Sequence, residues 1–335
     1  MFTFKTIKEQ MIKGIQFVEY SMKNEFLEVR FLNVGGVITK IAMAEDEFNE
    51  NLVLAYENYE NYLTNDCYLG ALVGRTSNRI KNGTFTINEK TFTVDLNDGP
   101  NNLHGGKENL SHTVFNVNQL QNGYLLSTTL PHQPHGFPGN LEINVSYLLN
   151  GNKLVISYEA SSDQDTLVNL TQHTYFNLSG NLKHSIYNHE LQISADTVAE
   201  VDENSSFTEL ELPVKHNLFD FTQRREINPD GMERLPLFEK TSGYDHLYHL
   251  TNPQSAAIFK DPISGRTLKI STTEPTMQFY AGNYLTSDIT FENGRQGESH
   301  LGACFETHLV PYDFESQILK ASEVYQQKTS FEFSR

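Results

Sequence analysis

The sequence predicts an all-β fold, a large antiparallel β-sandwich with long loops and little helix. Apolar residues alternate with polar ones wherever a periodicity is visible, which is the pattern of a half-buried strand. Turn residues interrupt these runs at short intervals, as in sandwiches and barrels. Apolar stripes at the helical period are missing, and the segment ENYENYLT at 57–64 is expected to form a short helix at most.

The first expected hairpin lies in residues 141–158, where apolar side chains share one face and the polar ones between them take the other. Asn150-Gly151 is its expected turn. A second hairpin is expected in residues 83–95, with a turn near Asn88-Glu89. Further strands are expected at residues 14–20, 25–33, 35–43, 124–130, 189–194, 256–260, 267–272 and 277–280.

The chain has no internal boundary in its composition. A linker rich in Pro and Ser, a block of like charges and a repeat of about 20–50 residues are all missing. The stretch 203–235 is the least regular, but LFDF at 218–221 carries enough apolar mass to pack. We therefore expect residues 1–335 to form a single β-sandwich domain.

Charge restricts the partners. Acidic residues outnumber basic ones 42 to 25, and the formal net charge of −17 disfavours nucleic acid and anionic membranes. The N-terminal segment shows neither a signal core nor an apolar run of about 18 residues. We expect a cytoplasmic protein that acts on a small molecule. Cys67 and Cys304 lie outside any metal-type spacing and are expected to be reduced and buried.

Four polar stretches place titratable residues in turns or at strand ends. They are NNLHGG with His104, TQHTYFNLSG with His173, SGYDHLYHL with Asp245 and GACFETHLVP with Glu306. Gly and Asn tolerate positive φ, so the first stretch predicts a compact loop that presents its histidine. Glu306 follows an apolar run, and its burial would raise its pKa toward the range of a general base.

Together these stretches resemble the aldose 1-epimerase family, also called galactose mutarotases, over nearly the whole chain. Eight segments are similar to those of the family and stand in its order: LGALVGRTSNRIKNGTFTIN, NDGPNNLHGG, HGFPGNLEINVSY, QHTYFNLSG, FDFT, GYDHLY, ISTTEPTMQFYAGNYL and FETHLVP. The resemblance implies the large mutarotase-like sandwich and the interconversion of α and β anomers of free hexoses such as galactose and glucose.

Carried over residue by residue, the resemblance makes Glu306 the general base and His173 the general acid. The residues that would bind and orient the sugar are His104, Asp245, Arg79, Asn78 and Gln278, with Tyr175 or Phe279 as the aromatic partner of a sugar face. Opening a pyranose takes a proton from the anomeric hydroxyl and gives one to the ring oxygen, so one base and one acid suffice. No metal or cofactor is expected.

Two features depart from the family pattern. After Glu306 the chain reads THLVPYD, with an altered loop from His308 to Asp313, and it contains no tryptophan although many relatives place one after the LHGG segment. The altered loop bears on sugar preference. Any stacking against a sugar face must come from an aromatic residue other than tryptophan. The preferred aldose, the pathway and the choice between monomer and homodimer stay open at this stage.

Three alternatives also stay open. A hexose-phosphate 1-epimerase would clamp its phosphate with Arg75, Arg79 or Lys107, against the acidic balance of the chain. A catalytically silent sugar-binding module would not need both His173 and Glu306.

The third alternative is a metal-dependent, cupin-like enzyme that uses histidine ligands. The pairs His132/His135 and His246/His249 are three residues apart, which does not point two side chains to one face of a strand.

Overall fold

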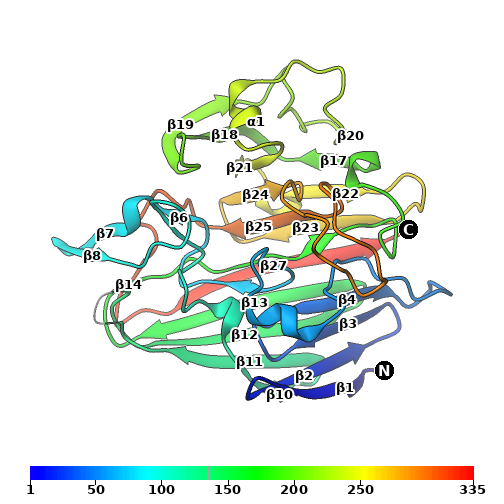
Figure 1. Ribbon diagram of the computed structural model, residues 1–335, viewed down its shortest axis with the longest axis horizontal. Coiled ribbons are helices and arrows are strands. Elements are labelled where there is room, and N and C mark those ends of the chain that lie inside the picture. Colours follow the sequence, from blue (N-terminus) through cyan, green and yellow to red (C-terminus); the bar gives the residue numbers. More distant parts are fainter. Residues whose placement is uncertain (134–135) are drawn as a thin grey trace.

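The computed structural model describes residues 1–133 and 136–335, and almost all of its regular structure is antiparallel strand (Figure 1). In this described part the α-helical segment is α1 (Pro236–Lys240), with 3₁₀ turns at η1 (Tyr59–Leu63), η2 (Lys81–Gly83), η3 (Leu110–His112), η4 (Ile186–Asn188) and η5 (Pro253–Ser255). The predicted all-β class is confirmed, and the short helix expected at 57–64 is η1. No helix of the described residues is long and apolar enough to cross a bilayer.

The largest sheet has nine strands and carries the hairpin of residues 141–158. In spatial order its strands are β10 (Asn116–Gln119), β11 (Gly123–Leu130), β12 (Leu141–Asn150), β13 (Lys153–Ser162), β27 (Tyr325–Ser334), β23 (Thr267–Thr272), β22 (Ala257–Lys260), β17 (Glu190–Ile193) and β20 (Arg225–Glu226). Alternate side chains of β12 are buried, as the pattern predicts. Asn150 pairs with Lys153, so the turn is Gly151-Asn152, one residue later than expected, with Gly151 at φ 59°.

The six-stranded sheet holds Asp245 and Glu306, two of the four titratable residues singled out above. Its order is β16 (Tyr175–Phe176), β25 (Ala303–His308), β24 (Thr276–Tyr280), β21 (Asp245–Leu250), β18 (Ala195–Val201) and β19 (Phe207–Pro213). All residues of β24 and β25 are buried, because the strands lie inside the protein. Glu306 is therefore an interior strand residue, whereas the sequence suggested a turn or strand end.

Smaller sheets complete the fold around these two. The four-stranded sheet is β1 (Thr3–Ile12), β2 (Ile15–Lys23), β3 (Leu27–Leu32) and β4 (Ile38–Met43). The pairs are β14 (Thr166–Leu167) with β26 (Ile318–Leu319), β15 (Thr171–Gln172) with β5 (Leu72–Val73), β6 (Arg79–Ile80) with β9 (Asn102–Leu103), and β7 (Thr84–Ile87) with β8 (Lys90–Thr93). The last pair is the hairpin predicted in 83–95, and Asn88 and Glu89 take the positive φ that its tight turn requires.

One hydrophobic cluster extends from Met22 to Phe333 and joins the inner faces of the sheets. It includes Leu218, Phe219 and Phe221 of the irregular stretch, which packs as expected. Every strand range expected from the pattern coincides with an observed strand. Of the strands with six or more residues, the expected ranges leave out β1, β18, β19, β21, β25 and β27. Of these, β25 is buried on both faces and shows no alternation.

Candidate active site

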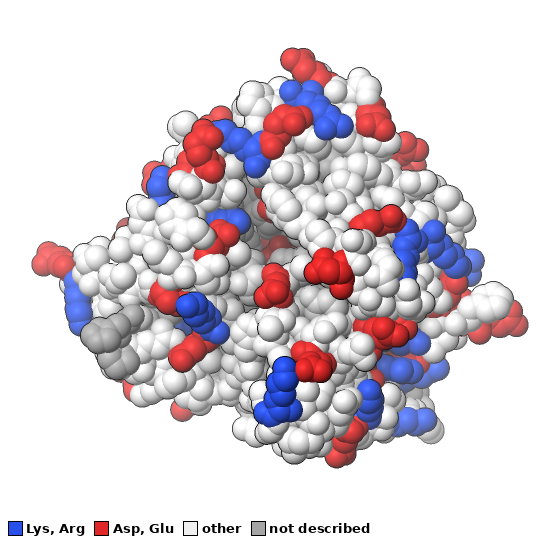
Figure 2. Space-filling view, in the orientation of Figure 1, with Lys and Arg blue, Asp and Glu red and all other residues white. Residues whose placement is uncertain are grey.

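A cavity of about 140 Å³ lies where the six-stranded sheet meets the loops around β6, β9 and η1. Figure 2 shows a hollow in this face of the molecule with acidic atoms inside it. The residues that line the cavity are Asp66, Cys67, Tyr68, Asn78, Arg79, Leu103, His104, His173, Tyr175, Asp245, Gln278, Tyr280, Tyr284 and Glu306. They include all eight site residues carried over from the resemblance.

Strand register brings several of these side chains together. Gln278 of β24 lies opposite Glu306 of β25, and Asp245 of β21 lies opposite Tyr280 of β24. Because residues two apart on a strand share a face, Gln278 and Tyr280 point to the same side. Three neighbouring strands thus present one polar face to the cavity.

Glu306 is a buried carboxyl group that lacks strong stabilising partners. It is 3% exposed, and its Oε2 has no hydrogen-bond partner among the described residues. Burial raises its pKa well above the ordinary value, the negative field of Asp245 adds to this, and Arg79 opposes it. This is the direction expected from the sequence, and a raised pKa suits a group for proton transfer near neutral pH.

His173 follows β15 and faces Glu306 directly. Its Nε2 lies 3.6 Å from Glu306 Oε1, and its backbone is fixed by hydrogen bonds to the Ala71 carbonyl and from the Gly70 amide. Burial lowers the pKa of His173 to about 4. Two buried titratable side chains thus face each other at the cavity.

His104 occupies the loop that the glycines of NNLHGG make possible. It has φ 55°, and its Nδ1 accepts a hydrogen bond of 3.1 Å from the Asn78 amide, which leaves Nε2–H as its available donor. A Cβ on Gly105 would lie 2.4 Å from the Gly74 carbonyl oxygen, so the loop needs a glycine there. Burial lowers the pKa of His104 well below its ordinary value, assisted by the charges of His173, Arg79 and His308.

A chain of side-chain hydrogen bonds crosses the cavity wall. Asn78 Nδ2 donates to Gln278 Oε1 over 3.4 Å, and Gln278 Nε2 donates to Asp245 Oδ1 over 2.6 Å. Burial raises the pKa of Asp245, while Arg79 and the Gln278 bond oppose the shift. The chain orients two amides and a carboxylate, which are the groups that recognise sugar hydroxyls by donating and accepting hydrogen bonds.

The basic residues separate clearly by position. Arg79 lines the cavity and donates from Nε to Asp98 Oδ2 over 2.7 Å. Arg75 is 2% exposed, and its guanidinium donates to four backbone carbonyls and the Thr166 hydroxyl, so it is a structural residue. Lys107 is exposed and is not part of the lining. One guanidinium therefore faces the cavity where a phosphate clamp would require a group of cations.

Aromatic residues surround His173. Tyr175 lines the cavity, with its ring centroid 5.0 Å from that of His173 and its hydroxyl donating to the Cys67 carbonyl. Tyr68 lies with its ring 4.6 Å from that of His104. Phe279 was wrongly expected to offer a stacking face, because it alternates with Gln278 and is packed at 0% exposure against Phe305 in the core.

Sequence reasoning missed several lining residues. Tyr280 could have been found, since it stands two positions after Gln278 on the same strand face. The segment Asp66-Cys67-Tyr68 and Tyr284 gave no signal, because loops bring them in from a distance in the sequence. Cys67 lines the cavity and is only half-buried, in contrast to the expectation for both cysteines, whereas Cys304 is buried as expected.

The proposed histidine pairs do not form a metal site in the described part of the chain. His246 Nδ1 accepts from the Asp245 amide, His249 Nε2 contacts the Tyr312 hydroxyl, and His132 Nδ1 accepts from the Gly139 amide. His135 lies outside the described residues. The groups whose ligand atoms do approach within 4.8 Å are His104, His173, Glu306 and, elsewhere, His184, His189, Asp261.

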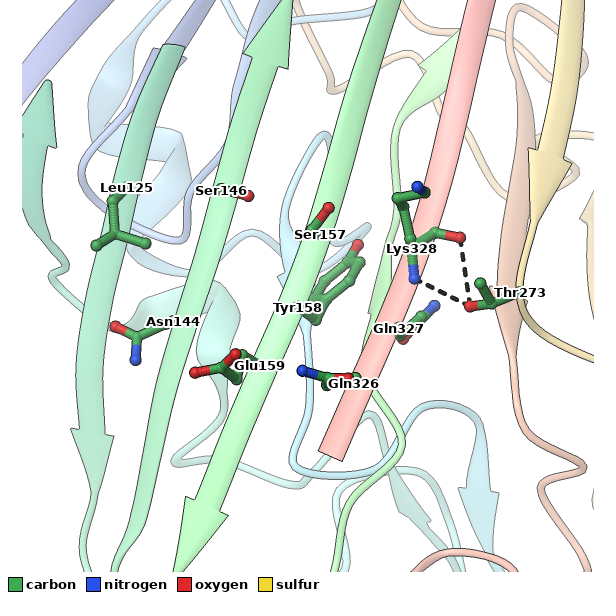
Figure 3. Close-up of a pocket in the computed structure, with 10 residues that line it drawn as sticks. All are labelled: Leu125, Asn144, Ser146, Ser157, Tyr158, Glu159, Thr273, Gln326, Gln327 and Lys328. Atoms are coloured by element: carbon green, nitrogen blue, oxygen red, sulfur yellow. Dashed lines mark hydrogen bonds between the residues drawn. The ribbon is translucent and has the colours of Figure 1, made fainter. Parts of the chain in front are cut away.

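A larger depression of about 630 Å³ lies on the nine-stranded sheet, over β11, β12, β13 and β27 (Figure 3). Its side chains are spread along the strands, with Glu159 beside Gln326, and Thr273 bonded to the backbone of Lys328. No acid and base converge there among the labelled residues. The smaller cavity is therefore the candidate active site.

Comparisons with known proteins agree with this assignment. The family model for aldose 1-epimerase matches residues 18–332. Galactose mutarotase of Sus scrofa is 35% identical over 325 residues, 94% of each chain, and aldose 1-epimerase of Haemophilus influenzae is 30% identical over 336 residues, 96% of each.

Solved structures show the same similarity. Galactose 1-epimerase from Lactobacillus acidophilus superposes with a TM-score of 0.87 at 25% identity, covering 100% of this chain and 98% of that one. An aldose epimerase homologue from C. elegans superposes with a TM-score of 0.84 at 26% identity, covering 95% and 98%. Nearly the whole chain is matched in both.

Proposed function

The chain belongs to the aldose 1-epimerase family, and we propose from this premise that Glu306 is its general base and His173 its general acid. As a member of this family it is an isomerase that interconverts sugar anomers. The observation that carries the residue assignment is the 3.6 Å approach of His173 Nε2 to Glu306 Oε1 inside the cavity.

The two groups can open and close a pyranose ring. Glu306 takes the proton of the anomeric hydroxyl while His173 gives a proton to the ring oxygen, so the C1–O5 bond breaks and C1 becomes a carbonyl. After rotation about C1–C2 the ring oxygen attacks the other carbonyl face. The two protons return along the same paths, and the opposite anomer leaves.

Burial of both groups fits this cycle. A neutral carboxyl with a neutral imidazole holds one proton, and so does a carboxylate with an imidazolium. The buried pair therefore passes between its resting and reactive forms by moving one proton within the pair. The raised pKa of Glu306 and the lowered pKa of His173 favour the neutral form of the pair at this buried position.

The remaining polar residues supply sugar contacts in this proposal. His104 donates from Nε2, Arg79 donates from its guanidinium, and the Asn78–Gln278–Asp245 chain offers fixed donors and acceptors. Tyr175 and its aromatic neighbours cover an apolar sugar face. The cavity volume of about 140 Å³ is of the order of a single sugar ring and favours a free hexose.

The alternatives are less well supported. A 6-phosphate would meet one lining guanidinium beside three lining carboxyl groups, those of Asp66, Asp245 and Glu306. A silent sugar-binding module would have no reason to keep an unpartnered buried carboxyl, which costs stability.

Polarimetry tests the function and its substrate. Freshly dissolved α-anomers of glucose, galactose, xylose and arabinose are followed with and without the protein, beside glucose 6-phosphate. We expect at least tenfold higher kcat/KM for free hexoses than for the phosphate. Equal values would favour the sugar-phosphate reading, and no acceleration of any sugar would favour the silent module.

We further propose a cytoplasmic role in galactose and general hexose metabolism, and one domain over residues 1–335. The continuous core from Met22 to Phe333 supports the single domain. Because one chain supplies the whole cavity lining, either a monomer or a homodimer would be active.

A further inference from the structure

The imidazole of His173 has a second contact that the reaction scheme does not use. While its Nε2 faces Glu306, its Nδ1 lies 3.4 Å from the sulfur of Cys304. Cys304 stands two positions before Glu306 on β25, so both side chains project from the same strand face. The strand thereby brings the proposed base and a thiol to the two nitrogens of one ring.

The thiol of Cys304 stays uncharged in this position. It is 0% exposed, and burial raises its pKa well above the ordinary value, with further contributions from the charges of Glu306, Asp245 and Cys67. A neutral thiol is a weak donor through S–H and a weak acceptor through sulfur. It can therefore contact Nδ1 whether or not that nitrogen carries a proton.

We propose that Cys304 is a positioning residue for the general acid, holding the imidazole with Nε2 toward the sugar through an uncharged contact at Nδ1. The inference rests on the proposed role of His173. A carboxylate at Nδ1 would stabilise the imidazolium and weaken it as an acid. A thiol fixes the ring without that effect, so the proton passes readily to the ring oxygen.

Other groups around the ring do not replace this contact. The titratable and charged groups near His173 are Glu306 of β25, Tyr175 of β16, Tyr280 of β24, and Tyr68, Cys67, His104, Asp245 and Arg79 of the cavity wall. The backbone carbonyl of His173 favours the protonated ring, and so it partly opposes the lowering of the His173 pKa by burial. Among the described side chains, the sulfur of Cys304 is the polar partner of His173 Nδ1.

Two substitutions separate positioning from packing. Cys304→Ser keeps a group that donates and accepts, whereas Cys304→Ala removes it with a similar loss of volume. We expect kcat within about twofold of wild type for the serine variant and a fall of about 3- to 10-fold for the alanine variant, with KM changed less than twofold in both. ¹⁵N resonances of the His173 ring should shift in the alanine variant and return toward wild type with serine.

A second pair tests the role of charge. In Cys304→Asp the carboxylate should lower kcat and move the acid limb of the kcat/KM profile, which reports protonation of His173, to higher pH, while the matched Cys304→Asn should leave that limb in place. Equal kcat and unchanged ring resonances in Cys304→Ala and Cys304→Ser would overturn the inference, even where the aspartate variant fails to fold. His173→Asn is measured alongside: if it keeps wild-type kcat, the acid assignment falls, and the inference with it.

Discussion

Two clusters among the described residues contain two histidines and one carboxylate, and we propose a catalytic role for only one of them. The cavity cluster is His104, His173 and Glu306, and the loop cluster is His184, His189 and Asp261. In each, one nitrogen or oxygen atom per residue lies within 4.8 Å of the others. Composition and distance therefore do not distinguish them.

Hydrogen bonding to the carboxylate does distinguish them. Asp261 accepts from the amides of Ile263 and Ser264 at 3.2 and 2.9 Å, and His189 Nε2 accepts from the Leu178 amide at 3.1 Å. Burial works to raise the pKa of Asp261, but the bonds from Ser264 and the charge of His189 outweigh it and lower the pKa. This cluster ties loops together.

Glu306 differs on each count. No backbone amide donates to its carboxyl group, Oε2 is unpartnered among the described residues, and its pKa is raised. A carboxylate satisfied by the backbone stabilises the fold, whereas an unsatisfied one beside a cavity is left to act on a ligand.

The largest expected effect that separates the clusters is on turnover. Glu306→Gln removes the base while keeping the size of the side chain, so kcat should fall by about 10²-fold or more. The kcat of His173→Asn should fall by a similar factor. The double variant should lose little more kcat than either single variant, because the two proton transfers act as one unit. The matched change in the loop cluster, Asp261→Asn, should keep kcat within about twofold when measured per folded molecule by polarimetry. A kcat within threefold of wild type for Glu306→Gln would remove that residue from the mechanism.

The next effect is on the pH profile of kcat/KM. The pair acts while it holds one proton, so activity should fall tenfold per pH unit on either side of a broad plateau. The acid limb reports a second proton added to His173, whose pKa is about 4, and the alkaline limb reports loss of the shared proton from Glu306, whose pKa is raised. The profile of Asp261→Asn should coincide with that of wild type. A plateau that ends near the ordinary carboxyl value would contradict this.

A smaller effect, of opposite sign in the two clusters, is expected on stability. Asp261→Asn should lower the free energy of unfolding by about 1–3 kcal/mol near neutral pH, because it weakens two backbone hydrogen bonds. Since the folded pKa of Asp261 is lowered, its contribution is present above the unfolded value near 3.8 and is lost as the pH falls below it.

Glu306→Gln should instead gain stability relative to wild type as the pH rises. The folded pKa of Glu306 is raised, so the wild-type protein loses stability as the pH climbs above about 4.5 toward that folded value. Urea unfolding of both variants at pH 4.5 and pH 8 measures the two trends. Parallel pH dependences would show that hydrogen bonding does not separate the clusters.

The smallest effect is expected from chelation. His104 Nδ1 and His189 Nε2 already accept hydrogen bonds from backbone amides, and the other ring nitrogen of each neutral imidazole carries a proton. One histidine in each cluster therefore has no free lone pair for a metal ion. Exhaustive dialysis against a chelator should leave kcat/KM unchanged within error. Loss of activity that a divalent ion restores would make the cavity cluster a metal centre.

The sequence predicted the architecture where strands are half-buried, because period-two alternation reports one buried face. Thus β12 and β13 were found with their hairpin. Strand β25, buried on both faces, has no alternation to detect and was missed, although β24, which is equally buried, was found. Through the ordered resemblance of eight segments the sequence also pointed to eight residues that the structure places around one cavity. Alternation alone could have shown that Gln278 and Phe279 do not both face the cavity, since neighbouring residues on a strand point to opposite sides.

By itself, the sequence determined the half-exposed strands, the glycine-bearing loop around His104, and which residues we propose as the base and the acid. Only the tertiary structure decided their partners, because hydrogen bonds and burial depend on segments distant in the chain. It gave the Arg75 guanidinium four carbonyl acceptors, brought Tyr68 to His104, left Glu306 Oε2 without a hydrogen-bond partner among the described residues and set Cys304 against His173. The pKa shifts follow from that environment, since desolvation is a property of the packed protein rather than of any residue alone.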